Sequence, residues 1–305
     1  MSVPPLERRV QFFTGKGGVG KSTVLSALAS ASARAGKRPL IVELGVHTSS
    51  AHLFAGPEVG YDPSEVAPGV YATRVLFEPA LVDYVTARLK LRPIAVLVAR
   101  NNSLRRLFMA APGVDEIVTL HRVAELAADE RWDPILVDLE STGHALMFFD
   151  LPSVLEVFLK DGPLRRVLDN ATELVRDDSR CAVHVVTVPE PLAVTETVQL
   201  YEGLRTRVEL SLGYLFINRI PRRWLDESEQ ALVEQELEHA RAGEPWAADL
   251  ALADYLIRRR RTAEKCLRGL RHDIALPTVT FDEHDAESRQ IIETLATDIE
   301  RSEAW

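Results

Sequence analysis

Short apolar runs alternate with stretches of helical periodicity along most of this chain. Runs rich in β-branched and aromatic residues, the pattern of buried strands, occur at residues 10–14, 39–44, 135–139, 181–188 and 212–217, with a weaker one at 274–279. Apolar positions recur at helical spacing over residues 22–34, 114–130 and 191–207. Strands that alternate with helices predict an α/β fold with a doubly wound, mostly parallel sheet.

Two segments interrupt this alternation. Residues 78–130 hold no clear strand pattern and predict a helical insertion over the strand ends. Residues 222–271 are helical in pattern and highly charged, with four consecutive arginines at 258–261. Such a basic run could bind nucleic acid or acidic lipid, although it is more often a solvated helix face. We expect both segments to belong to a single domain that covers residues 1–305.

The composition limits the classes of function. The 305 residues include 36 Lys and Arg against 45 Asp and Glu, a net charge of -9, whereas proteins that coat nucleic acid need surplus basic residues. No apolar run approaches the roughly 20 residues of a membrane-spanning helix, and no secretory signal pattern is visible. Cys181 and Cys266 are expected to be unpaired thiols. We therefore expect a cytoplasmic protein with no nucleic-acid partner and no stable membrane insertion.

A glycine-rich motif follows the first predicted strand and precedes the first predicted helix. It fits the phosphate-binding pattern G-x-x-x-x-G-K-[ST] and comprises Gly15, Lys16, Gly17, Gly18, Val19, Gly20, Lys21, Ser22 and Thr23. Glycines allow successive backbone N–H groups to face a polyphosphate, and the helix start adds its positive dipole end. We expect Lys21 to reach the β- and γ-phosphates of ATP, and Ser22 to ligate Mg²⁺.

A carboxylate is predicted beside this loop. The strand at 135–139 delivers Asp138 to its carboxyl end, where an acidic side chain can bind a water molecule of the Mg²⁺ shell. The loop also contains a second lysine, and GKGGVGKST resembles the deviant Walker A motif of the dimeric P-loop ATPases of the MinD and signal-recognition-particle class. The resemblance implies that Lys16 reaches the nucleotide of a partner subunit and compensates transition-state charge there.

Further motifs resemble the ArsA/Get family and follow that family's order from residue 11 to about residue 280. Its switch II pattern is matched by Asp138, Thr142, Gly143, His144, Leu146, Leu151 and Pro152. Residues 111–116 (APGVDE) and 188–197 (VPEPLAVTET) are similar to two further family segments. Asn218 stands where the family carries the asparagine that recognises adenine, and Pro277 stands near its base-capping loop. The resemblance implies a homodimeric Mg²⁺-dependent ATPase whose nucleotide state opens and closes the two subunits.

The sequence departs from the family pattern at the group that acts on the attacking water. Gly45 occupies the position of the switch I aspartate, and loss of a general base reduces rates about 10² to 10⁴-fold. Glu43 or His47 could replace it. Glu43 is the better candidate catalytic residue because it lies two positions earlier on the same strand face, although it could equally cap a neighbouring element.

Other departures concern metal and cargo. The chain has no CxxC, so it is similar to bacterial-type members and no zinc is expected. Two separated cysteines argue against arsenite as the cargo, and 3 Met make a Met-rich client groove less expected. Apolar residues near the insertion could form part of such a groove or pack in an ordinary core; these are Leu76, Phe77, Leu104 and residues 107–109.

The sequence thus predicts an ATP-binding and ATP-hydrolysing homodimer that handles an unidentified protein client or transport partner. An alternative, motivated by Gly45, is a nucleotide-binding switch or interaction module that hydrolyses slowly or not at all. A positioning ATPase of the ParA/MinD type is the weakest alternative. Its membrane or DNA contact calls for a basic surface, whereas the amphipathic tail at 291–305 carries several acidic residues.

Overall fold

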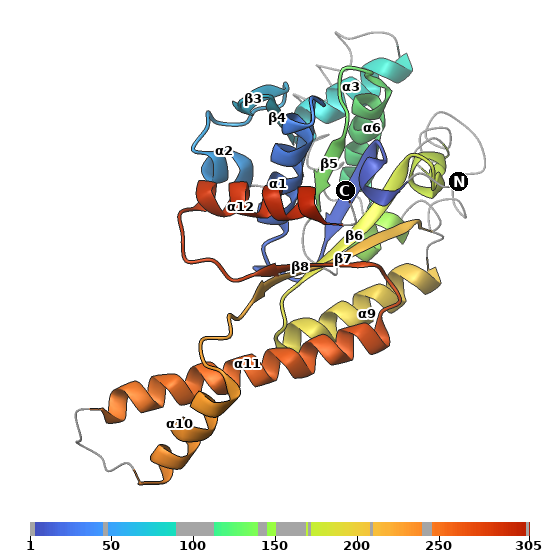
Figure 1. Ribbon diagram of the computed structural model, residues 1–305. Helices are drawn as coiled ribbons and strands as arrows, with labels where there is room; N and C mark the ends of the chain where they lie inside the picture. The colour runs from blue at the N-terminus through green and yellow to red at the C-terminus, as the bar shows by residue number, and fades with distance from the viewer. Residues whose placement is uncertain are drawn as a thin grey trace.

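A mixed sheet of eight strands runs through the described part of the molecule (Figure 1). The computed structural model describes residues 4–44, 48–89, 113–139, 145–150, 169, 172–207, 210–239, 246–302 and 305. The strand order is β3-β4-β2-β5-β1-β6-β7-β8. The strands are β1 Val10–Thr14, β2 Leu40–Leu44, β3 Ser64–Ala67, β4 Val70–Val75, β5 Ile135–Asp138, β6 Cys181–Thr187, β7 Leu212–Ile220 and β8 Thr278–Asp282. All neighbours pair in parallel except β3 and β4, so the predicted fold class is confirmed.

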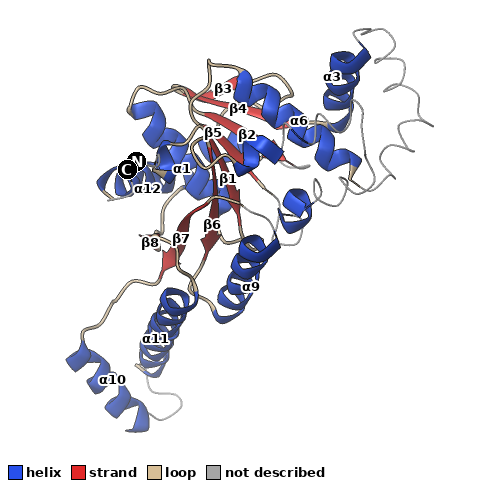
Figure 2. Ribbon diagram, turned by 90° about the vertical axis from the view of Figure 1, so that its right-hand side faces the viewer, coloured by secondary structure: helices blue, strands red, loops and turns tan. Residues whose placement is uncertain are grey.

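Helices cover both faces of the sheet, as a doubly wound fold requires. Figure 2 shows α1 and α12 on one side, and α6 and α9 on the other. A short 3₁₀ turn, Pro5–Glu7, precedes β1. The helices are α1 Lys21–Arg34, α2 Ser49–Phe54, α3 Phe77–Leu89, α6 Val114–Ala128, α9 Pro191–Arg207, α10 Glu227–His239, α11 Ala247–Asp273 and α12 Ser288–Arg301. A further helical segment spans residues 145–150.

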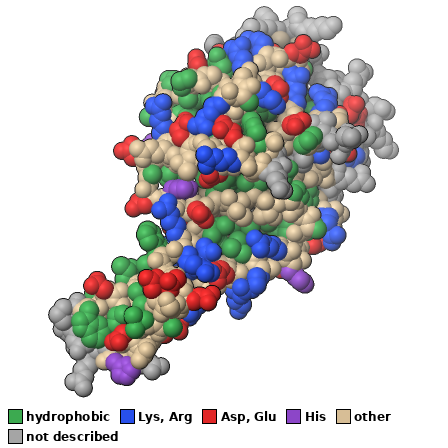
Figure 3. All heavy atoms as spheres, in the orientation of Figure 1, with side chains coloured by type: hydrophobic (Ala, Val, Ile, Leu, Met, Phe, Trp, Pro, Cys, Tyr) green, Lys and Arg blue, Asp and Glu red, His purple; other side chains and the backbone are tan. Residues whose placement is uncertain are grey.

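The charged segment forms two helices, α10 and α11, which extend away from the sheet (Figure 1). Acidic, basic and hydrophobic side chains are mixed over this arm in Figure 3. Each arginine of the basic run lies beside a carboxylate: Arg258 beside Asp254, Arg259 beside Glu283, Arg260 beside Glu264 and Arg261 beside Glu234. These ion pairs neutralise the run locally and favour a solvated helix face over an anion-binding surface.

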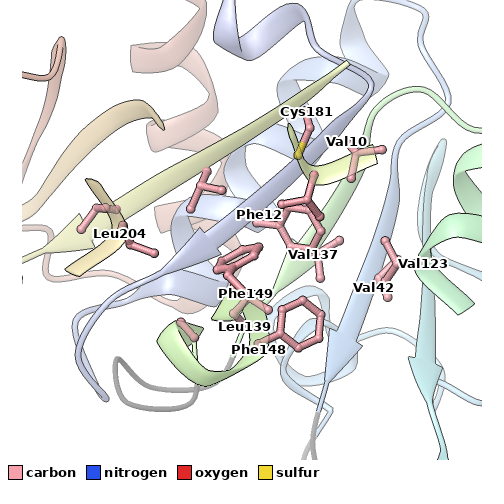
Figure 4. Packing of buried hydrophobic residues seen from close by; sticks show 14 of the residues in the cluster. Val10, Phe12, Val42, Val123, Val137, Leu139, Phe148, Phe149, Cys181 and Leu204 are labelled. Carbon is pink, nitrogen blue, oxygen red and sulfur yellow. The ribbon is translucent and has the colours of Figure 1, made fainter. Parts of the chain in front are cut away.

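Alternating strand residues divide the core into two layers. Val10 and Phe12 of β1 point to the face covered by α6 and α9, where Phe12 packs edge-on against Phe149 with ring centroids 5.3 Å apart (Figure 4). Phe13 points to the opposite face, covered by α1 and α12. Both layers are buried, which explains why β1, β2, β5 and β6 read as continuous apolar runs.

Several boundaries differ from the sequence prediction. The edge strands β3 and β4 were not predicted, because their residues alternate in exposure and include polar side chains. The last strand begins at Thr278 rather than at residue 274, because α11 continues through Asp273 and Pro277 has no N–H to donate to the sheet. Residues 90–112, the middle of the predicted insertion, lie outside the described residues. The flanking parts of that segment, α3 and α6, are helical and contact each other.

The apolar side of the C-terminal helix α12 belongs to the core. Ile292, Leu295, Ala296 and Ile299 are buried against α1. Arg34 of α1 pairs with Glu293 and, at 3.2 Å, with Glu300. Among the helices that the structure describes, none has both the length and the apolarity needed to cross a membrane.

Candidate nucleotide-binding site

The glycine-rich loop connects the carboxyl end of β1 to the first turn of α1 at the centre of the sheet, between β5 and β6. Gly15 adopts φ +148°, and a Cβ added there would lie 2.1 Å from the carbonyl oxygen of Val186. Gly20 adopts φ +91°, and its Cβ would lie 2.3 Å from Nδ2 of Asn218. No side chain fits at either position, so the loop conformation depends on these glycines.

Lys21 and the start of α1 complete the geometry of a phosphate cradle. The Lys21 Nζ donates to the carbonyl oxygens of Gly15 at 3.1 Å and Lys16 at 3.3 Å, which places the ammonium group over the loop. The first helical N–H groups and the positive dipole end of α1 face the same region. Backbone donors, a helix N-terminus and a lysine together fit a polyphosphate.

Ser22 and Asp138 meet on the β5 side of the loop. The Ser22 hydroxyl donates to Oδ2 of Asp138 at 2.5 Å. Burial raises the pKa of the Asp138 carboxyl to about 6; the Ser22 hydrogen bond and the charge of Lys21 oppose this effect, and the nearby Glu43 adds to it. A hydroxyl beside a carboxylate at the mouth of a phosphate loop is a donor set that suits Mg²⁺ with several retained waters.

Glu43 lies on β2 directly opposite Asp138 of β5 and is only 3% exposed. Its Oε1 accepts the backbone N–H of Ser50 at 2.7 Å, so this carboxylate caps the first turn of α2. Its Oε2 is buried with no hydrogen-bond partner within the described structure. Burial raises the pKa of Glu43, and the bond from Ser50 opposes the rise. The contact observed is thus the capping alternative, while Gly45 and His47 lie outside the described residues.

Lys16 does not lie over the loop in the way Lys21 does. Its Nζ forms an ion pair with Oε1 of Glu196 on α9 at 2.9 Å, and the two side chains are 27% and 32% exposed. Glu196 belongs to the 188–197 segment that the family resemblance singles out. The pair therefore connects the two motifs within one chain.

Asn218 and its neighbour fasten the loop to the end of β7. The Asn218 Nδ2 donates to the carbonyl oxygen of Val19 at 3.0 Å, and its Oδ1 accepts the backbone N–H of Arg219 at 3.0 Å. Arg219 Nη1 donates to the carbonyl oxygen of Gly18 at 3.1 Å. The structure thus brings Asn218 to the phosphate loop, where it supports the loop backbone; its expected contact with adenine stays a prediction.

The placement of Pro277 is a correction. Its carbonyl accepts the N–H of Leu215, and it precedes β8, which runs parallel to β7 with Leu215 opposite Thr278. Pro277 therefore lies at the amino end of its strand, whereas the phosphate loop lies at the carboxyl ends. Glu283 and His284, which follow β8, lie at the same edge of the sheet as the phosphate loop.

An open cleft of about 420 Å³ lies over the loop. It is lined by Gly18, Gly20, Lys21, Ser22, Thr23, Thr48, Ser49, His52, Leu53 and Arg219. The sequence analysis missed the α2 residues and Arg219 as site residues. The Thr-Ser-Ser run at 48–50 was the available signal, because such residues favour helix starts. Thr142, Gly143, His144, Leu151 and Pro152 of the switch II resemblance lie outside the described residues.

Comparison with known proteins agrees with a nucleotide-binding site at this loop, because the similar proteins are described as ATPases. A family model described as "Anion-transporting ATPase" matches residues 8–168, more than half of the chain. "ATPase BagA" of Mycobacterium tuberculosis is 29% identical over 222 residues, which cover 69% of this chain and 65% of that protein. "Putative arsenical pump-driving ATPase" of Halobacterium salinarum is 30% identical over 235 residues, 71% of this chain and 36% of that protein. "ATPase ASNA1 homolog 1" of Paramecium tetraurelia is 23% identical over 251 residues, which cover 68% of this chain and 74% of that protein.

The match therefore spans slightly less than two thirds of the first of these relatives and little more than a third of the second. The family match begins just before β1 and includes the phosphate loop, β2 and β5, the elements that carry Lys21, Glu43 and Asp138. Motif order, doubly wound fold and sequence similarity agree. The chain belongs to the ArsA family of anion-transporting ATPases.

Proposed function

We propose that this chain is a Mg²⁺-dependent ATPase that works as a cytoplasmic homodimer, whose nucleotide state opens and closes the two subunits around an unidentified protein client or transport partner. The observation that carries the proposal is the Ser22–Asp138 hydrogen bond at the mouth of a loop in which Gly15 and Gly20 leave no room for a Cβ atom. Two unpaired cysteines, both buried, support a reducing compartment.

The residues of the loop divide the work of binding. Backbone N–H groups of Gly15 to Lys21 and the amino end of α1 bind the β- and γ-phosphates, and Lys21 neutralises their charge. Ser22 directly and Asp138 through water would hold Mg²⁺. When bound, Mg²⁺ would neutralise charge on the phosphate oxygens. Lys16 is assigned to the nucleotide of the second subunit, for which it must leave Glu196.

Steady-state ATP turnover of the purified protein tests the proposal, with Lys21→Ala as the blank. Loss of the lysine removes a charge-assisted phosphate contact, so we expect ATP affinity to fall about 100-fold and turnover to vanish. Lys37→Ala is the matched control, because Lys37 lies just beyond the C-terminal end of α1, away from the phosphate loop, and pairs only weakly with Asp133 at 4.0 Å. Wild-type affinity in Lys21→Ala would contradict the assignment.

A second candidate function, a slowly hydrolysing nucleotide switch, has its own support. Among the described residues that line the cleft, none carries a carboxylate, and the nearby Glu43 is bound to the N–H of Ser50. Tight ATP binding without turnover above the Lys21→Ala blank would favour the switch. Turnover that Glu43→Gln abolishes while ATP binding persists would instead assign Glu43 to the attacking water.

The burial of α12 further disfavours the alternative of a positioning ATPase that binds a membrane through its C-terminal helix. An amphipathic tail can bind a membrane only if its apolar face is available. Here Ile292, Leu295 and Ile299 are buried against α1.

A further inference from the structure

Arg219 has a backbone conformation that calls for an explanation. It is the penultimate residue of β7 and adopts φ +55°, in the left-handed region that side chains disfavour. Within the described residues, Ala55 is the other non-glycine residue with a positive φ. A strained backbone persists where surrounding contacts hold it, and such positions gather at functional sites.

The contacts of Arg219 show what the bend achieves. Its backbone N–H donates to Oδ1 of Asn218 at 3.0 Å, and its Nη1 donates to the carbonyl oxygen of Gly18 at 3.1 Å. Its Nη2 lies 3.9 Å from the position a Cβ would take on Gly20. The bend therefore turns the guanidinium back over the phosphate loop, and one bond to Gly18 uses only one of its five N–H donors.

Arg219 also stands where two cavities meet. It lines the cleft of about 420 Å³ over the loop and a second cavity of about 350 Å³. The second cavity lies between the start of α9 and α11, and its walls include Pro189, Pro191, Pro221 and Tyr255. The wall formed by α11 is fixed by Arg259, which binds both oxygens of Glu283 at 2.8 Å.

The direction of a bound nucleotide follows from the sheet order. In the proposed site, Ser22 and Asp138 would hold the metal, and with it the β- and γ-phosphates, on the β5 side of β1. The other end of the nucleotide then points to the opposite side, where β6 and β7 end and Arg219 lies. A guanidinium is planar and stacks on aromatic rings, so it suits a base better than a lysine would.

We propose that Arg219 contacts the nucleoside end of ATP, with its guanidinium against the base at the junction of the two cavities, and thereby makes the site prefer a nucleotide over bare polyphosphate. The inference rests on the proposed ATP site. It adds a specificity-determining residue to that site and assigns the left-handed backbone at Arg219 the task of aiming the side chain.

Calorimetric binding of ATP and of inorganic tripolyphosphate to the full chain tests the proposal. We expect Arg219→Ala to weaken ATP binding about ten-fold and tripolyphosphate binding less than about two-fold, because stacking on a base is lost while phosphate contacts remain. Arg219→Lys keeps the positive charge but has no planar group to stack on the base, so it should lose most of the ATP affinity that Arg219→Ala loses. Arg205→Ala is the matched control, since this exposed arginine at the end of α9 lines neither cavity and pairs with Glu202 of the same helix.

Arg219→Gly separates the side chain from the backbone, because glycine adopts φ +55° without strain. It should show the same selective loss of ATP affinity while folding normally, as judged by thermal unfolding. Equal losses for ATP and tripolyphosphate would overturn the proposal and place Arg219 at the phosphates. Unchanged ATP affinity in Arg219→Gly would overturn it too, and the side chain of Arg219 would then serve only to hold the carbonyl of Gly18. Failure of the ATP site itself would appear separately, as wild-type ATP affinity in Lys21→Ala.

Discussion

At the scale of single residues, the conformation of the phosphate loop depends on those glycines whose Cβ position is blocked by a neighbouring atom. Gly15 and Gly17 are two positions apart in one motif, yet their surroundings differ. A Cβ on Gly15 would lie 2.1 Å from the Val186 carbonyl oxygen, in a backbone with φ +148°. A Cβ on Gly17 would meet nothing within 4 Å. The motif pattern alone does not distinguish the two, because both count as glycines of one flexible loop.

Gly15→Ala should therefore destabilise the fold by about 1–3 kcal/mol and reduce ATP affinity, since either the loop or β6 must move. Gly17→Ala should change the free energy of unfolding by less than about 0.5 kcal/mol. Chemical denaturation of the two variants beside wild type makes the comparison. Equal stability of both variants would mean that the loop relaxes freely and that the close approach to Val186 has no energetic effect.

His184 is a buried polar residue for which the structure supplies a complete set of partners. Its Nδ1 accepts the N–H of Tyr214 at 3.0 Å, and its Nε2 lies 3.2 Å from Oε1 of Gln11. The Gln11 amide nitrogen donates to the carbonyls of Leu6 and Arg8, so the Gln11 oxygen faces the histidine. This arrangement suits a neutral ring, and burial, with the charge of Arg8, lowers the pKa of His184 to about 3.

Because the pKa of His184 is lower in the folded state than the ordinary 6.5, the unfolded chain binds more protons between about pH 3 and 6.5. His184 should therefore reduce stability as pH falls through this window, by about 1.4 kcal/mol between pH 7.5 and 5.5. His184→Asn keeps an acceptor for Tyr214 but does not titrate. Between pH 7.5 and 5.5 its free energy of unfolding should therefore fall by about 1.4 kcal/mol less than that of the wild type. Urea unfolding of both proteins at the two pH values measures the difference, and parallel pH dependences would contradict the prediction.

At the scale of elements, prediction succeeded where local signals and tertiary structure agree. The pattern over residues 191–207 matches α9 end to end, because Pro191 suits a first helical turn. It failed at β3 and β4, since residues 64–75 lie at the sheet edge and lack a continuous apolar run. The family resemblance did not show that Pro277 precedes β8 and so lies at the edge of the sheet away from the phosphate loop. The bend at Arg219 could not be foreseen either, because a left-handed arginine is stabilised by tertiary contacts with Asn218 and Gly18.

The helix α12 offers an element-scale test of its role in the core. Leu295→Ala removes a side chain that is 1% exposed and should reduce the free energy of unfolding by about 2–5 kcal/mol. Glu287→Ala, which changes an exposed residue before the helix, is the control and should have an effect within about 0.5 kcal/mol. Chemical denaturation gives both values. A small effect of Leu295→Ala, together with binding of wild type to vesicles of anionic lipid, would instead mean that α12 leaves the core.

At the scale of the whole molecule, the proposed dimer requires one ion pair to be exchanged for another contact. Lys16 is bound to Glu196 within its own chain, at partial exposure where such pairs contribute only about 0.2–1 kcal/mol. A triphosphate on a facing subunit carries more charge than one carboxylate and would compete effectively for the ammonium group. The Lys16–Glu196 pair would then be a contact of the open, separate subunit.

Two variants of this pair should act in opposite directions. Lys16→Ala should bind ATP normally yet fail to dimerise on addition of a non-hydrolysable ATP analogue, because the contact across the interface is missing. Glu196→Gln releases Lys16 and should shift dimerisation to lower analogue concentrations, by up to about five-fold for a pair of this strength. Sedimentation velocity over an analogue titration distinguishes the two effects. Analogue-dependent dimerisation of Lys16→Ala that equals wild type would confine Lys16 to its own subunit, and the ion pair with Glu196 would then be a fixed brace between the phosphate loop and α9.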